Sequence, residues 1–240
     1  MLIFIKMLKK IFNLFGYTFS KYKKSNDINE IIKFRIKNIK PDLYIDCGAN
    51  YGQFTDAFLN NNDQFILFEP NPYLFDKLKV KYKKYKNIKI FPYGVGNKEE
   101  SKKLYITNDT GKTLSSIKEQ HPNLKKNFRN TQIVKTTIVE IKNIKKIILE
   151  NKLINKNKIF LKLDTQGNDY EALMGIKNII NRVKLLKIEL SVLPIYKKIY
   201  NHWSILEYLK KKKFSPIFFV NGEKNNDGKI IEYDCLFEKN

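Results

Sequence analysis

An apolar run that ends in an acid and runs into a tight glycine turn constrains the fold of this chain most. Residues 43–52 read Leu-Tyr-Ile-Asp-Cys-Gly-Ala-Asn-Tyr-Gly, and a second apolar run, followed by Pro-Asn-Pro, ends at Glu69. A helix-like stretch separates the two runs. This order is typical of a β-α-β unit that binds a nucleoside at the ends of its strands.

The spacing of the glycines separates two classes of cofactor. A dinucleotide fingerprint needs G-x-G-x-x-G, because the backbone must approach a pyrophosphate closely. Here the spacing is Gly48-x-x-x-Gly52, and Asp46 would repel a pyrophosphate. Glu69, 21 residues after Gly48, matches the acid that accepts hydrogen bonds from ribose hydroxyls. The pattern therefore favours S-adenosylmethionine, a cationic nucleoside without phosphates.

Alternating strand-like and helix-like segments predict the rest of the fold. We expect helices at 28–39, 52–61, 72–85, 140–154, 168–180 and 201–212. We expect strands at 43–47, 65–69, 88–92, 101–107, 131–139, 158–163, 184–190, 215–220 and 231–238. The polar segment 108–130 reads as a loop. The alternation predicts an α/β fold with a Rossmann-like, doubly wound, mostly parallel sheet and an antiparallel hairpin of the last two strands at its edge.

The 240 residues suffice for one domain, 31–240, preceded by an amphipathic helix and linker at 1–30. Lysines interrupt the apolar residues of segment 1–17, so no stretch reaches the roughly 20 residues that span a bilayer. Such a helix can lie on a membrane surface or pack on its own domain or on a dimer partner, and the pattern favours packing. The two cysteines lack metal-like spacing and are too few for a disulfide framework. The absence of such a framework indicates a cytoplasmic protein, with peripheral membrane contact as the alternative. The sequence predicts no oligomeric state.

The chain carries a net charge of +22, from 46 basic and 24 acidic residues. Such a charge can indicate a polyanionic partner. However, the excess is almost all lysine and accompanies abundant Asn and Ile, as A/T-rich codons produce. Arginine, which reads phosphates and bases with two hydrogen bonds, is scarce. The composition argues against nucleic acid as the partner and leaves an RNA methyltransferase as an alternative.

Four predicted strands end in acids, namely Asp46, Glu69, Asp164 and Glu189. Because ligands of such sheets bind at the carboxyl ends of the strands, we expect these acids on one rim. Methyl transfer to a hydroxyl calls for a general base. Asp164 is the first candidate, followed by His121 in the predicted loop and by Glu189.

Two neighbouring features receive no assigned role. Asp164 and Glu189 would suit a divalent ion such as Mg²⁺, but no ligand spacing predicts a metal site. Lys162, in the strand before Asp164, is expected to point away from the core or to pair with an acid.

Several segments together resemble the FkbM family of methyltransferases. They are residues 46–55, 68–72, 94–96, 161–175 (Leu-Lys-Leu-Asp-Thr-Gln-Gly-Asn-Asp-Tyr-Glu-Ala-Leu-Met-Gly) and 188–191, with Pro194 and Tyr196 after them. The resemblance covers about residues 40–240. It implies a seven-stranded Rossmann-like fold, S-adenosylmethionine as methyl donor and O-methylation of a sugar, a glycan or another hydroxyl-bearing small molecule. A non-catalytic protein that binds S-adenosylmethionine is the remaining alternative.

The resemblance also implies a set of site residues. Asp46, Gly48, Asn50 and Gly52 would hold the methionine part, Glu69 would hold the ribose, and residues 164–167 would lie beside the transferred methyl. The expected cofactor-binding set is completed by Ala49, Pro70, Gly94, Val95, Asp164 and Gly167. Three departures from the family pattern are expected on the acceptor side. They are Gln166 in place of a common Glu, Asn168 and Asp169 in place of a common Tyr-Glu, and Val139 in place of an acid.

Overall fold

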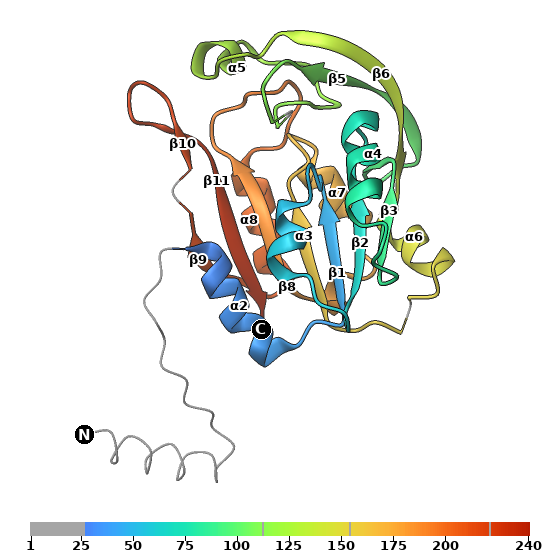
Figure 1. The fold of residues 1–240 in the computed structure, drawn as a ribbon. Coiled ribbons are helices and arrows are strands. Elements are labelled where there is room, and N and C mark those ends of the chain that lie inside the picture. Colours follow the sequence, from blue (N-terminus) through green and yellow to red (C-terminus); the bar gives the residue numbers. More distant parts are fainter. Residues whose placement is uncertain (1–26, 112, 154, 221) are drawn as a thin grey trace, which may run out of the picture.

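The structure is a computed structural model that describes residues 27–111, 113–153, 155–220 and 222–240. Its centre is a twisted sheet in the order β3-β2-β1-β7-β8-β11, and β9 and the short β10 both pair with the outer edge of β11 (Figure 1). The strands are β1 (Leu43–Cys47), β2 (Gln64–Phe68), β3 (Ile88–Phe91), β7 (Ile159–Leu163), β8 (Val183–Ser191), β9 (Phe214–Phe219), β10 (Glu223–Lys224) and β11 (Ile230–Lys239).

Helices cover both faces of this sheet. Successive side chains of each strand point to opposite faces, so both faces carry apolar side chains that the helices bury. Leu43, Ile45 and Cys47 of β1 join a core beneath α6 (Ile144–Glu150), α7 (Asp169–Gly175) and α8 (His202–Lys211). Tyr44 points to the opposite face, towards α2 (Ile28–Ile39), α3 (Gln53–Phe58) and α4 (Pro72–Lys81). The doubly wound, mostly parallel α/β architecture predicted from the sequence is confirmed.

A second, three-stranded sheet lies above the carboxyl ends of the main strands (Figure 1). It contains β4 (Tyr93–Val95), β5 (Glu100–Thr107) and β6 (Ile133–Lys142), in the order β4-β6-β5. Leu104, Ile106, Val139 and Ile141 form its small core. The loop between β5 and β6 is thereby brought over the rim where ligands of such sheets bind.

Several predicted boundaries were wrong. Segment 108–130 contains the short helix α5 (Pro122–Asn127), which begins where the His121 side chain accepts the N–H of Asn123. Strand β6 extends to Lys142, since Val139 and Ile141 are needed in the core of the second sheet, and a helix follows only at Ile144.

The predicted antiparallel hairpin of the last two strands at the edge of the sheet is confirmed. β11 lies between β8 and β9, so this hairpin adjoins the parallel strands through β11, and the short β10 also pairs with β11. Helix α7 ends at Gly175, five residues before the predicted end, and this glycine lies against the backbone of Gly96.

The predicted N-terminal amphipathic helix at 1–17 falls outside the described residues. Within residues 27–240, apart from the three undescribed positions 112, 154 and 221, no helix has the length and apolarity needed to cross a membrane.

Candidate cofactor and acceptor site

The turn after β1 lets other backbone segments approach closely. Gly48 has a φ of +76°, and a Cβ built there would lie 1.8 Å from the backbone oxygen of Asp164. Asn50 also has a positive φ, 51°, and its Nδ2 donates to the carbonyl of Gly111 at 3.0 Å. The turn is thus fixed between the segment after β7 and the loop after β5.

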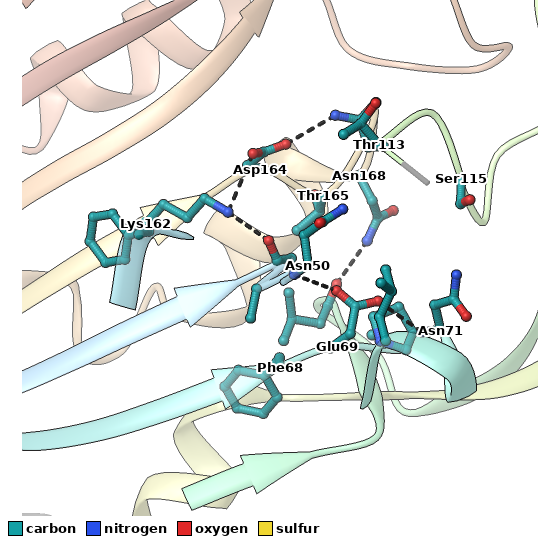
Figure 2. Close-up of a pocket in the computed structure, with 18 of the residues that line it drawn as sticks. Asn50, Phe68, Glu69, Asn71, Thr113, Ser115, Lys162, Asp164, Thr165 and Asn168 are labelled. Carbon is teal, nitrogen blue, oxygen red and sulfur yellow. Dashed lines mark hydrogen bonds and ion pairs between the residues drawn. The ribbon is translucent and has the colours of Figure 1, made fainter. Parts of the chain in front are cut away.

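Glu69, at the end of β2, holds this turn against the start of α4 (Figure 2). Its Oε2 accepts the N–H of Asn50 at 2.8 Å, and its Oε1 accepts the N–H of Asn71 at 2.9 Å. Burial raises the pKa of Glu69 to about 7, although these hydrogen bonds and the nearby Lys162 ammonium pull it down in part.

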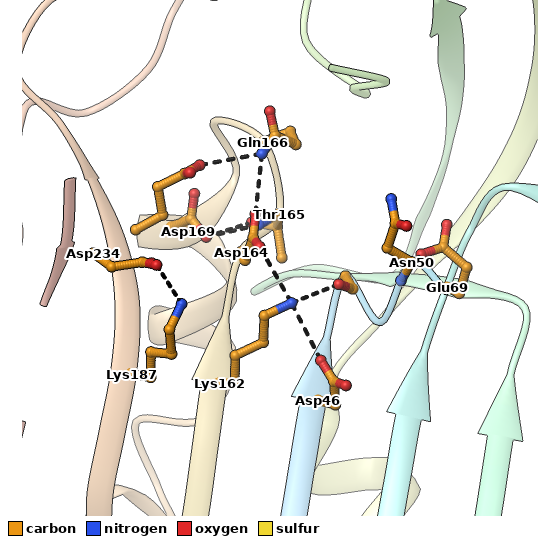
Figure 3. Close-up of polar contacts among 12 residues, drawn as sticks. Asp46, Asn50, Glu69, Lys162, Asp164, Thr165, Gln166, Asp169, Lys187 and Asp234 are labelled. Carbon is orange, nitrogen blue, oxygen red and sulfur yellow. Dashed lines mark hydrogen bonds and ion pairs between the residues drawn. The ribbon is translucent and has the colours of Figure 1, made fainter. Parts of the chain in front are cut away.

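Lys162 of β7 lies beneath the turn and joins three acceptors (Figure 3). Its Nζ donates to the carbonyl of Gly48 at 2.6 Å and lies 3.3 Å from Asp46 Oδ1 and 3.3 Å from Asp164 Oδ2. Asp46 Oδ2 accepts the Thr55 hydroxyl at 2.9 Å. Burial would lower the pKa of Lys162, but the Asp164 and Asp46 carboxylates more than offset this and raise it above its ordinary value.

Gln166 connects the acid after β7 with the acid near the end of β8 (Figure 3). Its Nε2 donates to Asp164 Oδ1 at 3.0 Å and to Glu189 Oε2 at 3.2 Å, while its Oε1 accepts the Tyr196 hydroxyl at 2.8 Å. Its backbone carbonyl accepts the Ser116 hydroxyl at 2.6 Å. These contacts orient the Gln166 side chain so that its Nε2, and not its Oε1, points towards Asp164 and Glu189.

The two connected acids have opposite pKa shifts. Burial alone would raise the pKa of Asp164, but the ammonium groups of Lys162 and Lys187 and the Gln166 amide outweigh it and lower the pKa. Burial, together with the charges of Asp164 and Glu232, raises the pKa of Glu189 well above its usual range. The surroundings therefore favour the ionised form of Asp164 and the protonated form of Glu189.

A cavity of about 410 Å³ opens beside these groups, within the size range of small-molecule sites. One part of its lining comes from the turn, from Glu69 and from the β4 segment. Another part carries polar and charged groups, from Thr113, Ser115, Ser116, Gln166, Lys187 and Asp234. Lys187 and Asp234 form an ion pair, with Nζ 2.6 Å from the carboxylate.

Most of the residues predicted from the sequence to bind the cofactor line this one cavity. They are Gly48, Ala49, Asn50, Glu69, Pro70, Gly94, Val95 and Asp164. The cofactor roles of these residues stay predictions, but the fold brings them together as expected.

Five predicted residues lie elsewhere. Asp46 is 1% exposed beneath the turn, and Gly52 lies against the Tyr82 hydroxyl. Gly167 and Glu189 line a smaller neighbouring cavity, and His121 caps α5 and lines neither cavity. The structure thus joins Glu189 to Asp164 but leaves His121 apart from both.

One departure from the family pattern has a different place from the one expected. Val139 is buried in the core of the second sheet and lines neither described cavity. The valine that stands here in place of the family's acid therefore contributes to packing in that core. Gln166 does line the main cavity, as expected.

The cavity is also lined by four residues for which the sequence predicted no role, namely Lys162, Ser116, Lys187 and Asp234. The pairing of Lys162 could have been predicted from the sequence, since a lysine inside the apolar run Ile-Phe-Leu-Lys-Leu needs a buried partner. Asp46 faces it in the strand register. The contact of Ser116 with Gln166 could not have been predicted from a local sequence pattern, because it spans 50 residues.

No group of three or more His, Cys, Asp or Glu side chains suited to a metal ion occurs in the described part of the chain.

Comparison with known proteins identifies related sequences and folds. Residues 46–216 match the family profile described as Methyltransferase FkbM domain. No curated protein matches the chain.

Three solved structures illustrate the structural similarity. Magnesium protoporphyrin IX methyltransferase from Synechocystis PCC 6803, with bound SAM, is 7% identical, with 88% of this chain and 79% of that chain covered and a TM-score of 0.44. A putative methyltransferase from Streptococcus mutans in complex with SAH is 13% identical, with 87% and 97% covered and a TM-score of 0.43. Precorrin-6y C5,15-methyltransferase from Geobacter metallireducens GS-15 is 12% identical, with 93% of each chain covered and a TM-score of 0.43.

Proposed function

The chain belongs to the FkbM methyltransferase family and is an S-adenosylmethionine-dependent methyltransferase, and from this premise we propose that it methylates a hydroxyl oxygen of a sugar, a glycan or another small molecule. The observation that carries the proposal is the lining of the main cavity. The cavity combines the predicted cofactor residues with polar side chains, among them the hydroxyls of Thr113, Ser115 and Ser116, the amide of Gln166 and the Lys187–Asp234 ion pair. Such a lining matches an acceptor with several hydroxyl groups better than a flat apolar ring.

The residues around the turn fit S-adenosylmethionine, which when bound supplies a methyl group activated by a sulfonium. Each carboxylate oxygen of Glu69 accepts one backbone N–H and keeps a lone pair for a ribose hydroxyl. Asn71 lines the cavity, and its Nδ2 has no hydrogen-bond partner among the described residues. Gly48 allows the backbone to approach, since it carries no Cβ.

Asp164 is our candidate for the group that accepts the proton of the hydroxyl. Its lowered pKa keeps it ionised at neutral pH and makes it a weak base. A weak base suffices, because the oxygen becomes far more acidic as it bonds to the incoming methyl. Burial raises the pKa of Glu189 well above its usual range, and its carboxyl group accepts a hydrogen bond from Gln166, so we assign it the role of orienting this amide.

Replacing Asp164 with Asn tests this role. The amide keeps the shape of the side chain but cannot take a proton, so we expect turnover to fall by about 100-fold or more. Affinity for S-adenosylhomocysteine, measured by calorimetry, should change by less than about threefold. Unchanged turnover would show that Asp164 is not the base.

A methyl-transfer screen with labelled cofactor tests the acceptor. Sugars, nucleotide sugars, lipids and RNA are offered in parallel, and we expect label in hydroxyl-bearing small molecules or glycans. Label in RNA alone, with binding that weakens steeply as salt rises, would support the alternative of an RNA methyltransferase. Cofactor binding without transfer to any of the four classes would support a non-catalytic binding protein.

A further inference from the structure

Lys162 is a buried lysine whose position the proposed chemistry does not by itself explain. Its side chain is 7% exposed, and the other four residues of β7 are apolar and buried. Burying an ammonium is costly unless it is paired and hydrogen-bonded. Since an apolar side chain would pack in such a strand without that cost, the reason for a lysine lies in what its ammonium holds.

The three acceptors of Lys162 come from two segments that meet at the site. Asp46 and the Gly48 carbonyl belong to the end of β1 and the turn after it, whereas Asp164 follows β7 (Figures 2 and 3). Asp46 alone would neutralise the ammonium, and the strand register already places it opposite Lys162. Yet the shortest contact, 2.6 Å, is to the uncharged carbonyl of Gly48.

The same two segments also touch directly. A Cβ on Gly48 would lie 1.8 Å from the Asp164 carbonyl oxygen, so a small shift of either backbone must move the other. The N–H of Asp164 donates to the carbonyl of Cys47 at 3.2 Å, which continues the strand pairing up to this point. Beyond it, the Lys162 ammonium is the group that holds both the turn and the Asp164 side chain.

We propose that Lys162 is a positioning residue, whose ammonium fixes the Gly48 carbonyl and the Asp164 carboxylate relative to each other and so aligns the cofactor turn with the acceptor side of the cavity. The part that concerns the turn rests on family membership alone. The part that concerns Asp164 rests on the proposed function.

The test separates positioning from simple charge neutralisation. Lys162→Met leaves Asp46 buried without its counter-ion and should lower the melting temperature. The double variant Lys162→Met with Asp46→Asn removes both charges, so the melting temperature should return to within a few degrees of wild type. Its affinity for S-adenosylhomocysteine should nevertheless stay at least about tenfold weaker, because the Gly48 carbonyl has lost its donor.

Hydrogen exchange on the same double variant gives a second readout. Protection should fall at residues 47–53, and the amides of β7 should keep theirs. The matched control removes another part-buried ion pair, Arg35 with Glu238, which joins α2 to β11 away from the cavity lining. Arg35→Met with Glu238→Gln should leave the affinity for S-adenosylhomocysteine within about twofold.

Two results would overturn the proposal. Wild-type affinity of the double variant would reduce Lys162 to a counter-ion of Asp46. Failure of the double variant to fold would make Lys162 a residue of folding rather than of positioning. None of these measurements needs an acceptor, so a failed acceptor screen would count against the proposed function and leave this proposal unaffected.

Discussion

The Glu69 carboxylate combines burial with two backbone hydrogen bonds, and its pKa of about 7 places its titration near neutral pH. Its position could be predicted from the sequence, because an acid after a buried strand and before Pro-Asn-Pro must lie at the rim of the sheet. Its pKa could not, since burial and the distance to Lys162 depend on how the strands pack.

Cofactor affinity should therefore depend on pH. Ribose hydroxyls donate to the ionised carboxylate, and protonation removes that acceptor, so the dissociation constant of S-adenosylhomocysteine should rise as pH falls from about 8 to 6. Calorimetric titrations across this range measure the slope. Glu69→Gln should bind more weakly at every pH and show a flatter profile, and an equally steep profile in this variant would assign the titration to another group.

The loop after β5 and the segment after β7 are joined by specific hydrogen bonds rather than by strand pairing. The Tyr196 hydroxyl lies 3.1 Å from the carbonyl of Leu114 and 2.8 Å from Gln166 Oε1, and the Ser116 hydroxyl donates to the Gln166 carbonyl. These contacts join three segments that lie far apart in the sequence. The strands on either side could be predicted from their alternating pattern, but these ties could not, because no local pattern encodes them.

Replacing Tyr196 with Phe should loosen this connection. Gln166 Oε1 loses its donor, so the amide can turn away from Asp164, and turnover should fall about tenfold while affinity for S-adenosylhomocysteine stays near wild type. The free energy of unfolding, from urea titration, should drop by about 1–2 kcal/mol. Tyr208→Phe is the matched control, since this buried hydroxyl has no hydrogen-bond partner among the described residues. Equal turnover of the Tyr196 variant and wild type would argue against any role of the Gln166 orientation.

Across the whole molecule, the pKa values of several buried carboxyl groups are raised. Burial raises the pKa of Asp169 to about 6, of Glu69 to about 7 and of Glu232 to about 8, and that of Glu189 lies well above its usual range. In the unfolded chain such groups titrate near 4. Between pH 4 and 8 the folded protein therefore binds more protons than the unfolded chain.

The ligand-free protein should consequently lose stability as pH rises from 6 to 8.5. The stability that these carboxyl groups contribute through their raised pKa values is fully present near pH 4. It is lost as pH rises through the pKa values of the folded state. Thermal unfolding at constant ionic strength should show a melting temperature several degrees lower at pH 8.5 than at pH 6. Glu232→Gln should reduce this difference, and a melting temperature that rises over the same range would contradict the assignment.

The sequence by itself determined the alternation of strands and helices, the glycine turn between Gly48 and Gly52, and the acid at Glu69. These depend on local chemistry, namely side-chain periodicity and the backbone freedom of glycine. The tertiary structure alone decided that β11 inserts beside β8, that Lys162 holds both Gly48 and Asp164, and that the pKa values of Asp164 and Glu189 shift in opposite directions. Those outcomes follow from strand register and burial, which bring together groups up to 114 residues apart and set the electrostatic surroundings that each of them experiences.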